Sequence, residues 1–121
     1  MILGLRTALY PAPDLAAGRA WYGKVLGIEP YFDQPFYVGF AVGGFELGLV
    51  PDAQPGDLGA QPLWGVTDIA AEVERLLALG AAPIDPVTEV GEGIKVAAVR
   101  DPFGNRFGLI ENPHFRVAEV R

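Results

Sequence analysis

The 121-residue sequence has no cysteine, a single histidine and no apolar run long enough to span a membrane. The lack of cysteine excludes disulfides, thiolate nucleophiles and cysteine-bound metals. Basic residues are also few, since nine Lys and Arg against 15 Asp and Glu give a net charge of −6. Phosphate backbones bind basic surfaces, so we expect no nucleic-acid partner. The N-terminal segment lacks a charged region before an apolar stretch, so we expect no secretory signal and, by default, a cytoplasmic location.

Half of the residues are hydrophobic, as in a folded domain, and the chain repeats one order of elements. A strand precedes Asp14, which caps a helix closing at Gly27, and three strands follow to about residue 51. After a Pro/Gly-rich connector at 52–60 the order returns, with a helix from Asp68 to Gly80 and strands to about residue 112. PDLAA recurs as TDIAA, and LGIEP as LGAAP. The chain is therefore predicted to be α+β, with a β-α-β-β-β module written twice.

The repeat lets corresponding positions be compared. Counting back seven residues from Asp14 and Asp68 pairs Thr7 with Gln61, and aligning FEL with FGL pairs Glu46 with Gly108. Because strand side chains alternate between faces, these four positions should lie on the sheet face away from the helices. The same face should carry several glycines, namely Gly39, Gly44, Gly48 and Gly65. We interpret this face as a ligand cavity wall, with Gly108 making room for a ligand.

The whole chain resembles the vicinal oxygen chelate superfamily, which includes glyoxalase I, extradiol dioxygenases, methylmalonyl-CoA epimerase and bleomycin-resistance proteins. The resemblance lies in PDLAAGRAWYGKVLG, GGFEL, VTDIAAEVERLLALGA and, most specifically, RDPFGNRFGLIE. It implies a single domain over 1–121, in which paired βαβββ modules form incomplete barrel-like mixed sheets with the helices on the outer face. Their concave faces would enclose a ligand. A fold of this kind leaves the function open.

In metal-dependent members of the superfamily, His and Glu at four repeat-related positions bind the metal. The resemblance places these positions at Thr7, Glu46, Gln61 and Gly108, of which only Glu46 is a good ligand for a transition metal. A catalytic metal needs about three protein ligands. We therefore expect no metal and no cofactor, and we set aside the glyoxalase, dioxygenase and epimerase activities.

Aromatic residues of the first module are candidates for ligand stacking. Tyr37 should face the cavity and Tyr31 and Phe32 should lie near its mouth, whereas Phe36 and Trp21 are expected in the core. Glu46, if unpaired in a partly dry cavity, should have a raised pKa or meet a cation; an ordinary strand carboxylate is the alternative. The roles of Arg100 and His114 stay open, although a surface role is the commoner one for both.

Two functions fit these residues. The first is a metal-independent, homodimeric small-molecule binding protein of the bleomycin-resistance type, which sequesters a cationic or aromatic ligand without catalysis. Its ligand-binding residues would be Thr7, Phe32, Tyr37, Gly39, Glu46, Gly48, Gln61 and Gly108. The alternative is a metal-free isomerase or lyase with Glu46 as general base. The identity of the ligand, and whether modules pair within one chain or between two, stay open.

Overall fold

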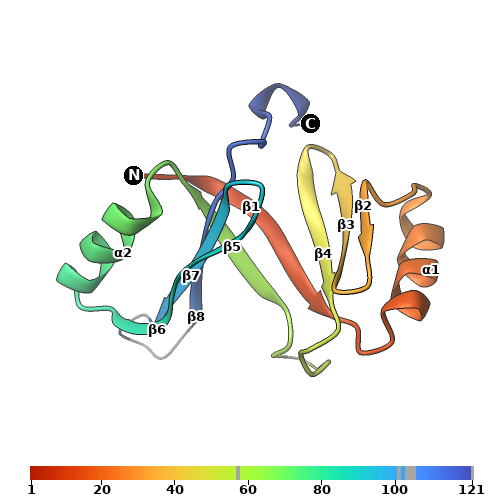
Figure 1. Cartoon of the computed structure of the whole chain (residues 1–121), viewed down its shortest axis with the longest axis horizontal. Coiled ribbons are helices and arrows are strands. Elements are labelled where there is room, and N and C mark those ends of the chain that lie inside the picture. The colour runs from red at the N-terminus through yellow and green to blue at the C-terminus, as the bar shows by residue number, and fades with distance from the viewer. Residues whose placement is uncertain (57, 101, 103–105, 121) are drawn as a thin grey trace. The chain divides into compact units, whose positions relative to one another are not determined.

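A computed structural model of the chain describes residues 1–56, 58–100, 102 and 106–120. These residues form eight strands, two α-helices and one short 3₁₀ helix (Figure 1). The elements are β1 (Ile2–Pro11), α1 (Leu15–Leu26), β2 (Phe32–Gln34), β3 (Tyr37–Val42), β4 (Phe45–Val50), β5 (Gln61–Val66), α2 (Ile69–Ala78), β6 (Ala82–Gly91), β7 (Ile94–Arg100), β8 (Arg106–Glu111) and η1 (Val117–Glu119). The predicted hairpin turn DPFGN falls mostly outside the described residues.

The chain divides into two compact units. The α1 unit comprises Thr7–Gln61 with the segment from Arg116, and the α2 unit comprises Met1–Arg6 with Pro62–Phe115. The hydrogen-bonded strand order is β2-β3-β4-β1-β5-β8-β7-β6, so β1 contributes to both units. Each unit has one parallel strand pair, which is β1 with β4 in the α1 unit and β5 with β8 in the α2 unit. The next strands, β3 and β7, pair antiparallel with β4 and β8. The predicted α+β class, with a mixed, open sheet of repeated βαβββ modules, is confirmed.

Both helices begin and end where the sequence predicts. The Asp14 carboxylate accepts a hydrogen bond from the Ala17 amide at 3.1 Å, and Asp68 accepts one from Ala71 at 3.2 Å. These caps satisfy amides that have no partner within the helix. Gly27 closes α1 at a φ of 70°, a left-handed conformation that favours glycine. No helix in the described part of the chain is long and apolar enough to cross a membrane.

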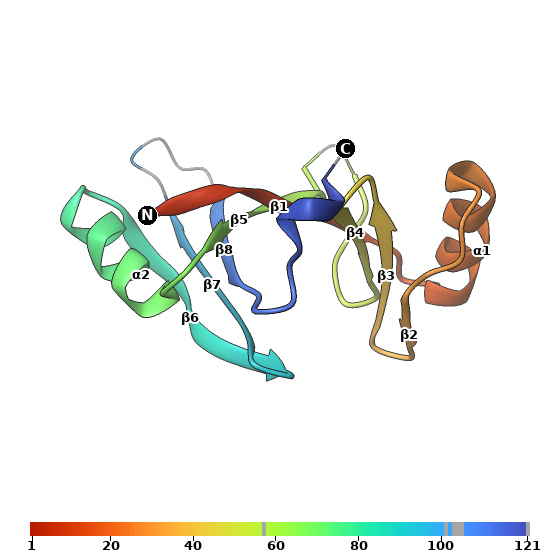
Figure 2. The same ribbon diagram turned by 90° about the horizontal axis from the view of Figure 1, so that it is seen from above.

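Each unit has its own apolar core between a helix and its sheet (Figure 2). In the α1 unit, Phe40 and Leu49 are fully buried and pack against Tyr22 of α1. In the α2 unit, Ile69 and Leu109 are buried, and Trp64 stacks on Phe107 with ring centroids 5.5 Å apart. Burying a side chain such as Phe40 contributes roughly 1.5–3 kcal/mol to folding. These cores fix the strands whose opposite faces carry the polar residues.

Two predicted core residues lie elsewhere. Trp21 is 59% exposed, because the α1 surface that meets the sheet is occupied by its neighbour Tyr22. Phe36 is 64% exposed, because it precedes β3 in the turn after β2 and does not continue the alternation of Val38 and Phe40. The prediction that both residues belong to the core is therefore wrong.

Candidate functional site

The candidate site lies on the face of the α1 unit that is turned away from α1. In the strand register, Glu46 of β4 is paired with Thr7 of β1 on one side and with Ala41 of β3 on the other. Gly48 of β4 is paired with Gly39 of β3. Tyr37 shares this face because it lies two residues before Gly39 in β3. Sequence alternation had assigned these residues to one face, and the register agrees. Their predicted role in ligand binding stays a prediction.

Hydroxyl groups surround the carboxylate of Glu46. The Thr7 hydroxyl donates to Glu46 Oε1 at 2.9 Å, and the Tyr31 hydroxyl donates to Oε2. The Tyr37 side chain lies close enough to this carboxylate for the charge of Glu46 to raise the pKa of the Tyr37 phenol. Thr7 is 7% exposed, so its hydroxyl would be costly to bury without such an acceptor. Of the alternatives left open for Glu46, the unpaired carboxylate is the wrong one, since neutral donors and not a cation satisfy it.

The two tyrosines stay protonated at neutral pH. Desolvation of its hydroxyl, followed by the hydrogen bond to Glu46 and the charge of Glu46, raises the pKa of Tyr31 above its ordinary value. Desolvation also raises the pKa of Tyr37, and the charge of Glu46 and the hydrogen bond to it act in the same direction. A negative charge beside a phenol disfavours the phenolate. Both groups therefore act as hydrogen-bond donors.

Two glycines make room for the side chains of Tyr31 and Tyr37. A Cβ at Gly48 would lie 2.0 Å from the Tyr37 hydroxyl oxygen and 2.6 Å from Tyr37 Cζ. A Cβ at Gly39 would lie 2.8 Å from Glu46 Oε2 and 3.1 Å from Tyr31 Cε1. Real Cβ atoms do not come so close, so Gly39 and Gly48 are needed for this arrangement. The space predicted to receive a ligand at these two positions is filled by the protein's own tyrosines.

Two phenylalanine rings lie beside these tyrosines. The Phe32 ring lies 6.0 Å from both the Tyr37 ring and the Phe36 ring, in edge-to-face geometry. We use the name aromatic cluster for these rings together with the Tyr31 ring, so its members are Tyr31, Phe32, Phe36 and Tyr37. Tyr31 is 61% exposed, and Phe36 is exposed to a similar degree, so solvent reaches both rings. Side-chain alternation identified Tyr37, whereas Phe36 was missed because it lies in a turn.

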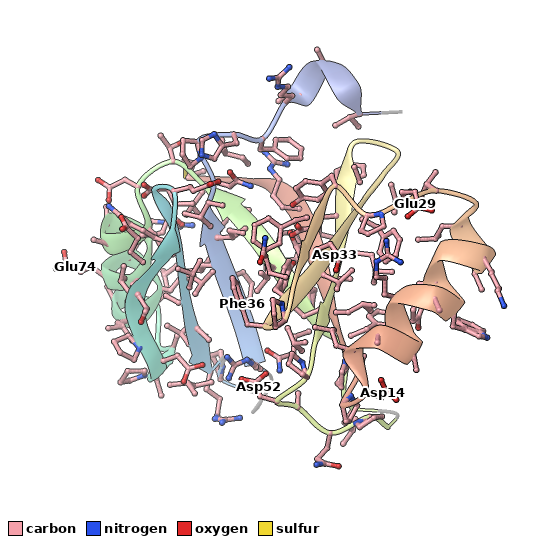
Figure 3. All side chains as sticks on the ribbon, turned by 45° about the vertical axis from the view of Figure 1, so that its right-hand side comes forward. Asp14, Glu29, Asp33, Phe36, Asp52 and Glu74 are labelled. Atoms are coloured by element: carbon pink, nitrogen blue, oxygen red, sulfur yellow. The ribbon has the colours of Figure 1, made fainter. Side chains whose placement is uncertain are left out.

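Arg19 of α1 holds the segment that carries Tyr31. Its Nε donates to Asp33 at 2.6 Å, and a terminal guanidinium nitrogen donates to Glu29 at 3.0 Å. These two carboxylates flank Tyr31 at two residues on either side, and Figure 3 shows them beside α1. The Tyr31 amide is also bound to the Gly39 carbonyl at 3.0 Å. Sequence analysis missed Arg19, whose partners are ten and 14 residues away and follow no helical spacing.

The corresponding strands of the α2 unit carry no polar pair. Gly108 is the register partner of Leu63, just as Glu46 is the partner of Thr7. Counting from the helix caps had selected Gln61, which lies two residues before Leu63; the segment from Thr7 to Asp14 is two residues longer than the segment from Leu63 to Asp68. A Cβ at Gly108 would lie 2.5 Å from Leu63 Cδ2 and 3.0 Å from the Pro62 carbonyl oxygen. Gly108 therefore accommodates Leu63 here.

Arg6 occupies the sheet face of the α2 unit beside Gly65. Its guanidinium carbon lies 3.7 Å from the centroid of the Phe115 ring, and a Cβ at Gly65 would lie 2.7 Å from Arg6 Cγ. A cation over an aromatic face is favourable, and it ties the segment after β8 to the sheet. Sequence analysis gave Arg6 no role, since Phe115 is remote in the chain.

The two residues left open by the sequence lie at the edges of the α2 unit. Arg100 is exposed at the end of β7. His114 is also exposed, and its Nε2–H donates to the Glu92 carbonyl at 2.9 Å. That hydrogen bond joins the segment after β8 to the turn between β6 and β7. Both residues therefore lie at the surface, as expected.

The residues at the four superfamily positions do not fit a transition metal. The positions that the resemblance selects, Thr7, Glu46, Gln61 and Gly108, supply one carboxylate and no imidazole. Stable binding of a catalytic metal takes about three such ligands. Across the described ranges of the chain, no group of three or more His, Cys, Asp or Glu residues is placed to hold a metal ion.

The fold and the sequence place the protein in a known family. The family model of the Glyoxalase-like domain matches residues 7–110. The chain therefore belongs to the Glyoxalase-like domain family, within the vicinal oxygen chelate superfamily. A comparison with curated protein sequences gives no significant match.

Several solved structures share this fold. A Q60A variant of methylmalonyl-CoA epimerase from Streptomyces coelicolor has a TM-score of 0.75 at 13% identity, covering 93% of this chain and 99% of that one. The methylmalonyl-CoA epimerase of Mycobacterium tuberculosis has a TM-score of 0.70 at 19% identity, with 91% and 88% covered. A Legionella pneumophila structure described as an NAD-dependent benzaldehyde dehydrogenase has a TM-score of 0.67 at 19% identity, with 87% and 96% covered. At such identities the likeness shows the fold alone.

Proposed function

We propose that this protein is a metal-independent small-molecule binding protein that takes a cationic, aromatic ligand on the face of the α1 unit. The observation that carries the proposal is the Glu46 carboxylate, hydrogen-bonded by the Thr7 and Tyr31 hydroxyls and bordered by the aromatic cluster. A carboxylate supplies the counter-charge, and aromatic rings supply stacking and cation–π surface. Sequestration of a drug-like molecule, as in bleomycin-resistance proteins, requires affinity and no chemistry.

The polar environment of Glu46 favours binding over base catalysis. The Thr7 and Tyr31 hydroxyls already occupy one lone pair on each carboxylate oxygen. Those two lone pairs are not open to a substrate proton, whereas the negative charge of Glu46 can still attract a cation.

The proposal is tested by a thermal-shift screen of cationic aromatic compounds with protein treated with a chelator. We expect hits among the cations, unaffected by the chelator, and no shift for uncharged analogues of the same size. Each hit should be lost in Glu46→Gln and weakened in Tyr37→Ala. Hits that persist unchanged in both variants would place the ligand elsewhere on the protein.

A metal-free acid–base enzyme is the second candidate. One observation favours it: the Tyr31 and Tyr37 hydroxyls beside Glu46 are donors that could stabilise an oxyanion. Under this function, Glu46→Gln abolishes turnover of a substrate while its binding survives. Under the leading function, the same variant loses binding, so single-turnover assays and calorimetry on one variant separate the two.

We also propose that the protein is a homodimer and that it acts in the cytoplasm without a nucleic-acid partner. The exposed α1 side chains Trp21 and Val25 support a dimer, because they lie four residues apart on one helix face and are 59% and 56% exposed. Light scattering of the protein and of Trp21→Glu tests the association. A monomeric wild type would contradict it.

A further inference from the structure

The hydrogen bonds to Glu46 limit which cations this carboxylate can bind. An ionised carboxylate offers about four lone-pair sites for hydrogen bonds. Thr7 occupies one on Oε1 and Tyr31 occupies one on Oε2. About two sites are therefore left for a ligand. The negative charge remains, whereas about half of the acceptor capacity is used.

The surroundings of Glu46 offer few other acceptors on this face. Ala41 and Gly39 are its β3 neighbours and carry no polar side chain, and the Tyr31 hydroxyl of the aromatic cluster already donates to the carboxylate. Arg19 of α1 is paired with Asp33 and Glu29. The charge of Glu46 thus faces aromatic surface.

A primary ammonium would fit this site poorly. It carries three N–H donors, and with about two free acceptors at least one of them would lose hydration without compensation. A quaternary ammonium has no N–H donor, and its methyl-covered charge is recognised by aromatic faces. We propose that the cationic group of the ligand is an onium group without N–H donors, such as a quaternary ammonium. This rests on the proposed function of the same site and specifies its ligand class.

Two probes of equal charge test the inference, benzyltrimethylammonium and benzylammonium, titrated by calorimetry into the full chain. Cation–π recognition predicts that benzyltrimethylammonium binds about tenfold more tightly. Tyr31→Phe keeps the ring but removes the donor to Oε2, which frees an acceptor site for an N–H group. We therefore expect this variant to reduce the preference to about threefold or less.

Tyr10→Phe is the matched control. Tyr10 lies on the α1 side of β1, where its ring contacts Tyr22 at 6.0 Å, so the same chemical change there should leave the preference intact. A circular dichroism melt of each variant establishes that it is folded, and the exposure of Tyr31 makes a folding defect in Tyr31→Phe unexpected.

The outcomes separate the two proposals. Tighter binding of benzyltrimethylammonium with a reduced preference in Tyr31→Phe supports the inference. Equal or tighter binding of benzylammonium by the wild type, or a preference that Tyr31→Phe leaves unchanged, overturns the inference while cation binding at Glu46 stands. If neither probe binds, or if both bind Glu46→Gln as they bind the wild type, the proposed function itself fails.

Discussion

Thr7 and Glu46 are register partners on β1 and β4, and their side chains are hydrogen-bonded at 2.9 Å. The partners in the same relationship in the α2 unit, Leu63 and Gly108, are apolar, and the leucine fills the space beside the glycine. The two units therefore repeat the fold and differ in chemistry at this pair of positions. At this pair of positions the α1 unit has a carboxylate that lies among hydroxyl groups and aromatic rings, and the α2 unit has none.

Gly48→Ala should destabilise the protein by about 1–3 kcal/mol, because the new Cβ overpacks against Tyr37. The Tyr37 hydroxyl oxygen lies 2.0 Å from the Cβ position, so the ring must leave its place on the sheet. Gly23→Ala in α1 is the matched control, since its Cβ would meet the nearest atom, the Ile28 carbonyl oxygen, at 3.6 Å. Helix propensity predicts that this control stabilises by about 0.5–1 kcal/mol. Urea unfolding measures both, and equal effects would contradict the close contact.

The raised pKa of Tyr37 predicts a loss of stability at alkaline pH. The folded protein holds the phenolic proton more tightly than the unfolded chain, whose tyrosines titrate near 10.0. The contribution is thus fully present below about pH 10 and is lost as the pH rises toward the raised folded value. Tyr37→Phe should reduce the slope of stability against pH above about 10. Parallel slopes for wild type and variant, measured by urea unfolding from pH 8 upward, would contradict the assignment.

Arg19→Gln should weaken ligand binding by a fewfold while changing stability little. The side chain forms two exposed ion pairs, which contribute about 0–1 kcal/mol each, but they flank Tyr31 on both sides. Releasing them adds an ordering cost to any ligand that needs the Tyr31 ring in place. Arg106→Gln, which breaks the pair with Asp85 in the α2 unit, is the control and should leave affinity unchanged. The same affinity loss in both variants would exclude a positioning role for Arg19.

The repeated pattern of caps, turns and alternation made much of the fold predictable. Asp14 and Asp68 cap the helices as expected, and the alternation around Gly39, Glu46 and Gly48 assigned the right face. Local rules suffice for such features, because cap spacing and strand parity depend on a few consecutive residues.

The failures arose where a feature depends on residues remote in the chain. The equivalence of Thr7 and Gln61 assumed equal spacing to the helix caps, whereas strand register pairs Leu63 with Gly108. Glycines were interpreted as space for a ligand, but Tyr37 and Leu63 occupy that space. The side chains of Tyr37 and Leu63 are long enough to reach a glycine on the neighbouring strand. Strand alternation predicts the sheet face of a side chain but not the direction in which it extends along that face.

The most direct test of cation binding at Glu46 is the affinity of benzyltrimethylammonium for wild type, Glu46→Gln and Asp52→Asn, measured by calorimetry at one ionic strength. Glu46→Gln keeps the size of the side chain and removes its charge. Asp52 is an exposed residue of the same unit, so Asp52→Asn controls for the change in net charge. We predict that affinity falls about tenfold or more in Glu46→Gln and by less than about twofold in Asp52→Asn. Equal affinities of the two variants would contradict the binding site.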